Sequence, residues 1–334
     1  MIPTTQSCLS PHRAAARTLR LLAAALSCAA LSGVALAQVS AGPVAAACNG
    51  VAPSGELTAT RVPGSAPASA EAGLYEGPVW IGDALYFSDF TFGPGFPSRV
   101  QRLGPDGKLS TAIPDSGSNG LAVDARGNIV AGTHKYKGVS RFDLASGKRS
   151  LVAGTYRGQV FNSPNDVAIG ADGTIYFTDP SFQRGAAPGG QDATRVYRVA
   201  PGGKVTVVDG GIANPNGISL SPAGDILYVN GGGEHGVLRA YPIVRGVPGK
   251  GRDLVGALAV PDGMTVDCQG NIYVTEHTAQ RLRVFSPAGK ELALIKVDAN
   301  ITNAAFGGAD GKTLFMTGAG ALWQIRLDLP GKPY

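Results

Sequence analysis

The sequence predicts an all-β fold, a six-bladed β-propeller whose last blade is closed by an N-terminal strand. A hairpin-like pattern recurs along the chain, short apolar runs alternate with Gly, Pro and Asp turns, and no stretch keeps a helical period. The six copies of the pattern start at Glu76, Asn119, Asn165, Asn216, Asp262 and Asn303, which are separated by 43, 46, 51, 46 and 41 residues.

The third copy shows what each unit contains. Two apolar runs, Val167–Ile169 and Ile175–Phe177, flank a turn at Ala171-Asp172-Gly173, which is typical of a β-hairpin. Further strand-like segments follow in each unit, such as Arg195–Val199 in this one. A unit of this kind has room for about four strands, the usual content of a propeller blade.

The two ends of the repeat region indicate how the propeller closes. The last unit ends soon after its third strand, whereas a strand-like segment, Glu56–Val62, precedes the first unit without a blade of its own. Because an unpaired strand edge invites association, we expect this segment to complete the sixth blade. The propeller domain is therefore predicted over residues 55–330, after an N-terminal arm over residues 38–54.

Residues 1–37 are predicted to be a secretory signal peptide. Three arginines precede the apolar run Leu21–Ala30, and Ala35-Leu36-Ala37 has the small residues of a cleavage site. The apolar run is too short to favour a membrane span, so we expect a secreted or periplasmic protein with no membrane attachment once this segment is removed. Lipid attachment at Cys28 is the weaker alternative, because Ala25 stands where such sites usually have Leu.

Removal of this segment changes the charge and the cysteine count. The full chain has 29 Lys and Arg against 24 Asp and Glu, a formal charge of +5, and without the three arginines the balance is 26 against 24, or +2. With no basic run either, the sequence gives no reason to expect nucleic acid as a partner. Cys48 and Cys268 remain, and export favours a disulfide between them, with two unrelated thiols as the alternative.

The first polar residues of the units predict a metal site. If they begin the innermost strands, they converge at one mouth of the central channel. The carboxylates of Glu76 and Asp262 and the amide oxygens of Asn165 and Asn216 are hard donors, which suit one divalent cation, first Ca²⁺, with Mg²⁺, Mn²⁺ or Zn²⁺ as alternatives. Asn303 is interpreted as a turn residue.

The ends of the second strands should return to the same mouth and form its wall. These positions carry Asp89, His134, Asp179, Asn230, Glu234, His235, Glu276 and His277. His134 and His277 each follow a strand end directly, so we expect them to contact substrate. Asp166 and Asp179 are interpreted as supporting and wall residues. Asn119 is either another turn residue or a substrate contact.

Four motifs carry a family resemblance. Glu76-Gly-Pro-Val-Trp, Pro164-Asn-Asp, Pro215-Asn-Gly and Pro261-Asp-Gly-Met stand in order at blade spacing and resemble the senescence-marker-protein/gluconolactonase/luciferin-regenerating-enzyme family. The similarity runs from about Gly73 to Leu329. It implies a six-bladed propeller with one divalent metal, held by Glu76, Asn216 and Asp262, with Asn165 as a fourth ligand or a substrate contact and Asp262 as the general base.

One departure limits what the resemblance implies. Animal members of the family have an arginine two residues before the Asn of the second motif, where it helps to hold the sugar, and this chain has Ser163 there. The form Asn162-Ser-Pro-Asn-Asp, together with His134, looks more like bacterial gluconolactonase relatives. Recognition of sugar acids therefore cannot be carried over directly from the animal proteins.

The expected function is metal-dependent hydrolysis of a lactone, with sugar (aldono- or glucono-) lactones as substrates. The cation would activate the ring carbonyl and Asp262 would accept a proton from the attacking water. Asn119, His134, Asn165 and His277 are the expected substrate contacts. Two alternatives remain open: a phosphotriesterase or other esterase that uses the same site, and a non-catalytic secreted propeller that binds Ca²⁺.

Overall fold

The structure is a computed structural model, and it describes residues 47–65 and 73–332. The predicted signal peptide, residues 1–37, and most of the predicted arm lie outside the described residues. Within the part that the structure describes, no helix is long and apolar enough to cross a membrane. The only helices among these residues are two single 3₁₀ turns, η1 (Arg184–Ala186) and η2 (Gly233–His235).

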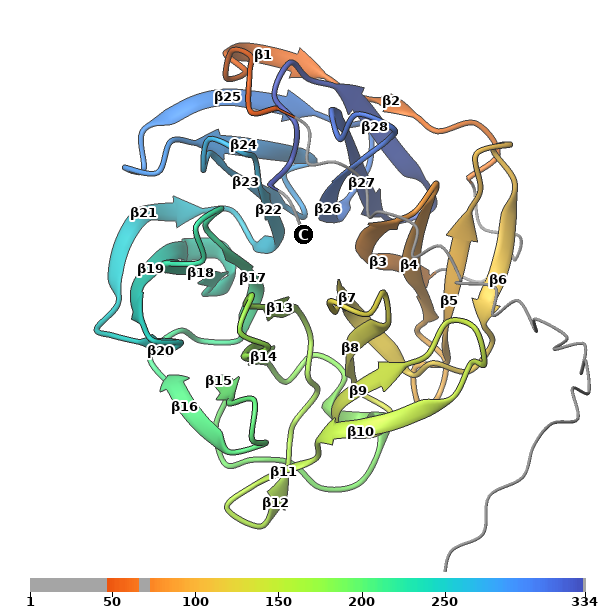
Figure 1. Cartoon of the computed structure of the whole chain (residues 1–334), viewed down its shortest axis with the longest axis vertical. Coiled ribbons are helices and arrows are strands. Elements are labelled where there is room, and N and C mark those ends of the chain that lie inside the picture. Colours follow the sequence, from red (N-terminus) through yellow and green to blue (C-terminus); the bar gives the residue numbers. More distant parts are fainter. Residues whose placement is uncertain (1–46, 66–72, 333–334) are drawn as a thin grey trace, which may run out of the picture. The chain divides into compact units, whose positions relative to one another are not determined.

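The strands form six sheets around a central channel, which confirms the predicted six-bladed β-propeller (Figure 1). Blade 1 is β3 (Gly73–Ile81), β4 (Ala84–Thr91), β5 (Ser98–Leu103) and β6 (Leu109–Ile113). Blade 2 is β7 (Ser118–Val123), β8 (Ile129–Thr133), β9 (Gly138–Phe142) and β10 (Arg149–Ala153). Blade 3 is β13 (Val167–Ile169), β14 (Ile175–Asp179), β15 (Arg195–Val199) and β16 (Val205–Asp209). A small hairpin, β11 (Thr155–Tyr156) and β12 (Gln159–Val160), precedes blade 3.

The second half of the chain repeats this plan. Blade 4 is β17 (Pro215–Leu220), β18 (Ile226–Gly231), β19 (Gly236–Val244) and β21 (Arg252–Leu258), with β20 (Val247–Pro248) paired to the end of β19. Blade 5 is β22 (Pro261–Val266), β23 (Ile272–Glu276), β24 (Arg281–Phe285) and β25 (Glu291–Lys296). Blade 6 contains β26 (Ile301–Gly307), β27 (Thr313–Gly318) and β28 (Leu322–Arg326). In each blade the first of these strands is the innermost.

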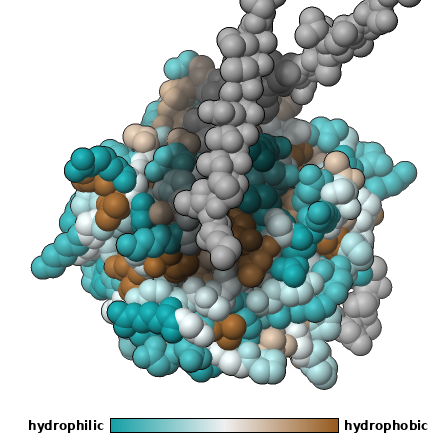
Figure 2. All heavy atoms as spheres, turned by 60° about the horizontal axis from the view of Figure 1, so that its bottom comes forward, coloured by the Kyte–Doolittle hydropathy of each residue, from teal (hydrophilic) through white to brown (hydrophobic). Residues whose placement is uncertain are grey.

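The hydrophobic core lies between neighbouring blades. Successive residues of a strand point to opposite faces of its sheet, so one strand serves two interfaces. On β14, Tyr176 packs toward blade 4 with Ile218, whereas Phe177 packs toward blade 2 with Val139. Apolar clusters of this kind occur between all six pairs of adjacent blades. The face drawn in Figure 2 is mostly hydrophilic, with apolar residues scattered among the polar ones.

The N-terminal segment closes the ring in two steps rather than one. The strand β2 (Thr60–Arg61) pairs with β28 and completes blade 6, as predicted. The preceding strand, β1 (Gly55–Thr58), instead lies parallel to β25 as a fifth strand of blade 5. The expected single strand is therefore divided at Ala59, whose N–H donates to the carbonyl of Lys296.

A disulfide joins Cys48 to Cys268 across a sequence separation of 220 residues. It fastens the described end of the N-terminal arm to the turn between β22 and β23. Two hydrogen bonds accompany it: the N–H of Val51 donates to Asp328 Oδ2 at 2.7 Å, and Gln269 Nε2 donates to the carbonyl of Gly50 at 3.3 Å. The start of the propeller domain is thus connected to blade 5 covalently as well as by the pairing of β1 with β25.

Candidate metal and substrate site

The predicted ligands lie near the start of the inner strands, where the pairing of each inner strand with its neighbour is irregular. The register of the inner strand against its neighbour shifts between Pro215 and Ile218 and between Pro261 and Met264, and the other inner strands of blades 1, 2 and 6 shift in the same region. A β-bulge bends a strand and re-aims a side chain. Asn216 and Asp262 lie within these shifts, so the bulges account for polar side chains turned toward the channel.

The glycines that follow Asn119, Asn216 and Asp262 are needed for close approach between blades, and the turn alternative for Asn119 was wrong. A Cβ atom on Gly217 would lie 2.4 Å from the carbonyl oxygen of Asp262. On Gly120 it would lie 2.3 Å from Oδ1 of Asp166. These Asn-Gly and Asp-Gly pairs lie within the inner strands β17, β7 and β22, not between strands. The small residue therefore lets adjacent inner strands meet at the axis.

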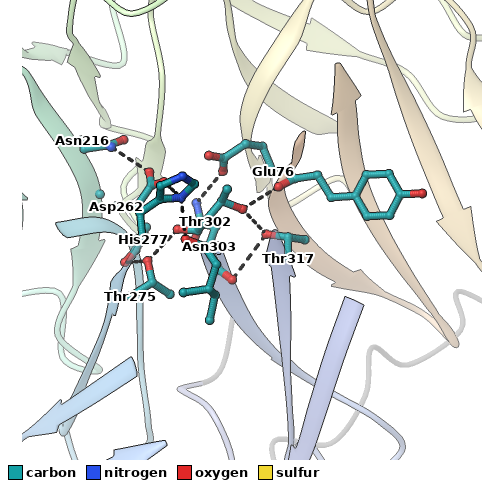
Figure 3. Close-up of polar contacts among 12 residues, drawn as sticks. Glu76, Asn216, Asp262, Thr275, His277, Thr302, Asn303 and Thr317 are labelled. Carbon is teal, nitrogen blue, oxygen red and sulfur yellow. Dashed lines mark hydrogen bonds and ion pairs between the residues drawn. The ribbon is translucent and has the colours of Figure 1, made fainter. Parts of the chain in front are cut away.

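Asp262 is held between two blades. Its Oδ1 accepts a hydrogen bond from Asn216 Nδ2 at 2.7 Å, and its Oδ2 lies 3.5 Å from His277 Nδ1 (Figure 3). His277 Nδ1 also lies 2.8 Å from the carbonyl oxygen of Ile301. Because a carbonyl can only accept, this nitrogen carries the hydrogen, and Nε2 is the unprotonated nitrogen of the neutral ring. Burial lowers the pKa of His277, which favours that neutral form.

Glu76 approaches the same space from blade 1. Its Oε2 accepts from the N–H of Gly77 at 3.0 Å and from Asn303 Nδ2 at 3.5 Å (Figure 3). Burial, then the negative charges of Asp262 and Asp166, raise the pKa of Glu76 well above its ordinary value. Burial and the charge of Asp166 likewise raise the pKa of Asp262. Buried carboxylates this close cannot all stay ionised without a positive charge among them.

Three amide oxygens near these carboxylates have no hydrogen-bond partner among the described residues, although they are buried. They are Oδ1 of Asn119, Asn165 and Asn216. A buried acceptor without a partner costs free energy, so such atoms call for a bound group. With Glu76 and Asp262 they form a set of hard oxygen donors, which fits Ca²⁺ or a similar cation. We refer to Glu76, Asn119, Asn165, Asn216 and Asp262 as the ligand ring.

The ring depends on amide oxygens as well as carboxylates. Among the residues that the structure describes, no three His, Cys, Asp or Glu side chains gather as a metal site. The donors of the ring are two carboxylates and three amide oxygens, and hard cations such as Ca²⁺ accept Asn oxygens as well as carboxylates.

Asn303 lies one residue out of phase with the position that the repeat spacing suggested. In blade 6 Ile301 pairs with Gly318, and in blade 5 Pro261 pairs with Glu276 in the same way. The counterpart of Asp262, which follows Pro261, is therefore Thr302, which follows Ile301, and not Asn303. Asn303 takes the place of the following glycine, and the turn interpretation of Asn303 was wrong. The corresponding residue of blade 3 is Asp166. Blades 3 and 6 have no glycine at this position, so the repeat motif marks neither residue, and strand pairing is needed to place Asn303.

These two residues contact one another across the channel. Asn303 Nδ2 donates to Oδ1 and Oδ2 of Asp166 at 2.9 and 3.1 Å. Burial raises the pKa of Asp166 to about 7, against the effect of those hydrogen bonds. Both residues also line a cavity of about 950 Å³ that opens among the inner-strand hairpin turns. Asn303 also contacts Glu76, so it touches both the cavity and the ligand ring.

Several expected wall residues instead support the framework. Asp89 pairs with Arg99 and Gln101, and Glu276 accepts from the N–H of Ala259 and from Arg281. Asn230 accepts from the N–H of Gly217 at 3.0 Å. His134 is fully buried, with Nε2 2.8 Å from the carbonyl of Phe96. Glu234 and His235 lie in η2 and are exposed.

A further residue near the ring comes from a loop that the repeat does not contain. Gln183 lies between β14 and β15, and its Oε1 accepts from Asn119 Nδ2 at 3.4 Å. Only 8% of Gln183 is exposed. No repeat spacing or motif in the sequence pointed to this residue.

Comparison with known proteins agrees with this architecture. Residues 74–320 match the model of the SMP-30/Gluconolactonase/LRE-like region. The chain belongs to this family. A gluconolactonase of Zymomonas mobilis is 30% identical over 291 residues, which cover 75% of this chain and 78% of that protein. A pentonolactonase of Haloferax volcanii is 28% identical over a match that covers 79% of this chain and 86% of that protein.

Solved structures give the same fold. A gluconolactonase from Xanthomonas campestris superposes with a TM-score of 0.69 at 28% identity, covering 84% of this chain and all of that one. A calcium-binding protein, regucalcin, from Agrobacterium tumefaciens gives a TM-score of 0.66 at 20% identity, covering 85% of this chain and 100% of that chain. At that identity the second match supports the propeller fold alone.

Proposed function

We propose that this protein is a lactonase-type hydrolase that depends on one divalent cation, with Ca²⁺ as the first choice. The observation that carries the proposal is the ligand ring, in which buried amide oxygens without partners surround the carboxylates of Glu76 and Asp262. Membership of a family whose members include gluconolactonases gives the reaction class. Sugar lactones are the proposed substrates, because relatives are named for hydrolysing gluconolactone and pentonolactone.

Glu76, Asn165, Asn216 and Asp262 would hold the cation, with Asn119 as a further oxygen donor. When bound, a divalent cation supplies Lewis-acid polarisation of a carbonyl oxygen. Such a site stabilises the negative charge that develops when water attacks a lactone. Asn165 or Asn119 can also orient the lactone through a free amide oxygen.

Asp262 is the proposed general base. Its Oδ1 is fixed by Asn216, which leaves Oδ2, beside His277, to accept a proton from water. The water oxygen bonds to the ring carbonyl carbon, the ring carbon–oxygen bond breaks, and the proton passes to the leaving ring oxygen. The product is the open-chain hydroxy acid. If residues 1–37 direct export, this reaction takes place outside the cytoplasm.

Hydrolysis assays with purified protein test the proposal. We expect activity on glucono-δ-lactone that prolonged chelation abolishes and added Ca²⁺ restores. The Asp262→Asn variant should lose about 10²-fold or more in kcat, the usual effect of removing a general base. Asp253→Asn is the control, because Asp253 lies on the outer strand β21, paired with Arg239.

The outcomes separate the alternatives. Activity that survives chelation would contradict the metal mechanism, and a D262N variant with wild-type kcat would contradict the assignment of the base. Preference for a phosphotriester or a simple ester over every lactone would favour the esterase alternative. Melting that depends on Ca²⁺ without hydrolysis of any of these substrates would favour the binding propeller.

A further inference from the structure

We propose that Gln183 determines substrate specificity by donating a hydrogen bond from Nε2 to a hydroxyl group of the bound lactone. This inference rests on the proposed lactonase function and extends it to a preference for hydroxylated lactones over unsubstituted ones. Gln183 belongs to the segment between β14 and β15, residues 180–194, which we call the blade 3 loop.

Ser163, the position at which the family resemblance leads one to expect sugar recognition, is directed into the protein. Ser163 is fully buried, its N–H donates to Asp179 Oδ1 at 2.8 Å, and its hydroxyl donates to the carbonyl of Pro180 at 2.7 Å. A side chain engaged in this way cannot contact a ligand. It instead anchors the first residue of the blade 3 loop.

The same loop is held at several other points. Buried Lys137 donates from Nζ to the carbonyl of Asn162 at 2.7 Å and also to that of Arg184. Gln191 Nε2 donates to the carbonyls of Tyr156, Gln159 and Val160 in the β11–β12 hairpin. These anchors keep the loop in one conformation, so a side chain that it presents is placed before substrate binds.

Gln183 is presented toward the ligand ring. Its Oε1 accepts from Asn119 Nδ2, which leaves Oδ1 of Asn119 as one of the unpartnered oxygens. Its own Nε2 has no hydrogen-bond partner among the described residues. Unlike the unpartnered oxygens of the ring, this nitrogen is not fully buried. The site thus has an amide donor on a side chain that is itself bonded to a residue of the ligand ring. A donor placed in this way discriminates against a ligand that lacks the matching hydroxyl, because the donor is then left unpaired.

The test compares two lactones of the same ring size, glucono-δ-lactone and δ-valerolactone, which lacks the hydroxyl groups. For Gln183→Met we expect KM for glucono-δ-lactone to rise about 3- to 10-fold, the effect of one lost hydrogen bond, with kcat nearly unchanged. Parameters for δ-valerolactone should stay within about twofold of the wild type. Gln183→Glu, which keeps the acceptor for Asn119 and removes the donor, should show the same substrate-dependent loss.

Gln101→Met is the matched control. It removes a buried amide of blade 1 that bonds to Asp89 and Thr111, away from the blade 3 loop, so it should lower the melting temperature and leave the ratio of kcat/KM for the two lactones unchanged. Equal losses on both lactones in Gln183→Met would mean that Gln183 acts only through Asn119 or the fold, and no loss on either would mean no contact; both results overturn the inference. A wild-type protein that hydrolyses neither lactone would instead refute the proposed function.

Discussion

A Cβ atom on Gly263 would lie 1.9 Å from Cγ of Asn303, the shortest approach of this kind around the ligand ring. Asn303 cannot turn aside freely, because its amide is bonded to Asp166 and Glu76. Gly263→Ala should therefore lower the free energy of unfolding by about 1–3 kcal/mol, the usual cost of overpacking, and weaken Ca²⁺ binding. Urea unfolding with and without Ca²⁺, together with a Ca²⁺ titration, measures both effects.

Gly256→Ala is the control for this substitution. Gly256 also lies in a strand, β21, and an added Cβ would meet nothing within 4 Å. We expect its unfolding free energy and its Ca²⁺ affinity to stay near those of the wild type. If Gly263→Ala behaves like Gly256→Ala, the blades at the axis have room to adjust, and close approach does not explain the glycine.

At the residue scale, the sequence led to the ligand ring because the ring follows the repeat. Asn165, Asn216 and Asp262 stand at one position of units 3, 4 and 5 and Glu76 begins unit 1, so the repeat together with the oxygen-donor chemistry of these side chains selected them. Asn303 could not be interpreted correctly in this way, since only strand pairing shows that it is one residue out of phase. Gln183 could not be predicted for a different reason. Its loop is an insertion that the repeat does not contain, so the repeat spacing does not locate this residue.

At the scale of elements, Asp179 connects β14 to the segment that carries Asn165. It accepts hydrogen bonds from the N–H groups of Asn162 and Ser163 at 3.0 and 2.8 Å. Burial raises the pKa of Asp179 from 3.8 to about 7, against the effects of those hydrogen bonds and of the charges of Lys137 and Arg184. The folded protein thus binds this proton more tightly than the unfolded chain does.

That difference predicts how stability depends on pH. A raised pKa contributes stability that is fully present below the unfolded value of 3.8 and is lost as pH rises through about 7. The melting temperature in saturating Ca²⁺ should therefore fall between about pH 5 and pH 8. Asp179→Asn should melt lower but with a flatter pH dependence over that range, whereas the exposed-strand control Asp253→Asn should keep the wild-type slope. An unchanged slope in Asp179→Asn would show that other groups control it.

Most strands were predictable from the sequence. The strands with which the N-terminal segment pairs at the closure were not. Alternating apolar residues and Gly or Asp turns identified the hairpins, because each strand buries side chains on two faces between blades. The segment Glu56–Val62 carries the same strand signal throughout, so nothing in its pattern marks the change of partner at Ala59. That change follows from where β25 and β28 present free edges, which only the assembled blades define.

For the whole molecule, the closure combines β1, β2 and the disulfide. A cross-link over 220 residues restricts the unfolded chain strongly, and the chain-entropy model gives as much as about 5 kcal/mol for a loop of that size. Strand pairing at β1 and β2 contributes only to the folded state. The disulfide is therefore expected to affect stability far more than catalysis.

Cys48→Ser and Cys268→Ser test this expectation as a pair. Each should lower the free energy of urea unfolding by several kcal/mol, up to about 5, with kcat on a lactone near that of the wild type under native conditions. The two variants should match one another, because either one removes the same cross-link, and reductant should bring the wild type to the same midpoint. If the wild type unfolds at the same urea concentration with and without reductant, the cross-link does not stabilise the closure. A loss in only one variant would assign the effect to local packing at that cysteine.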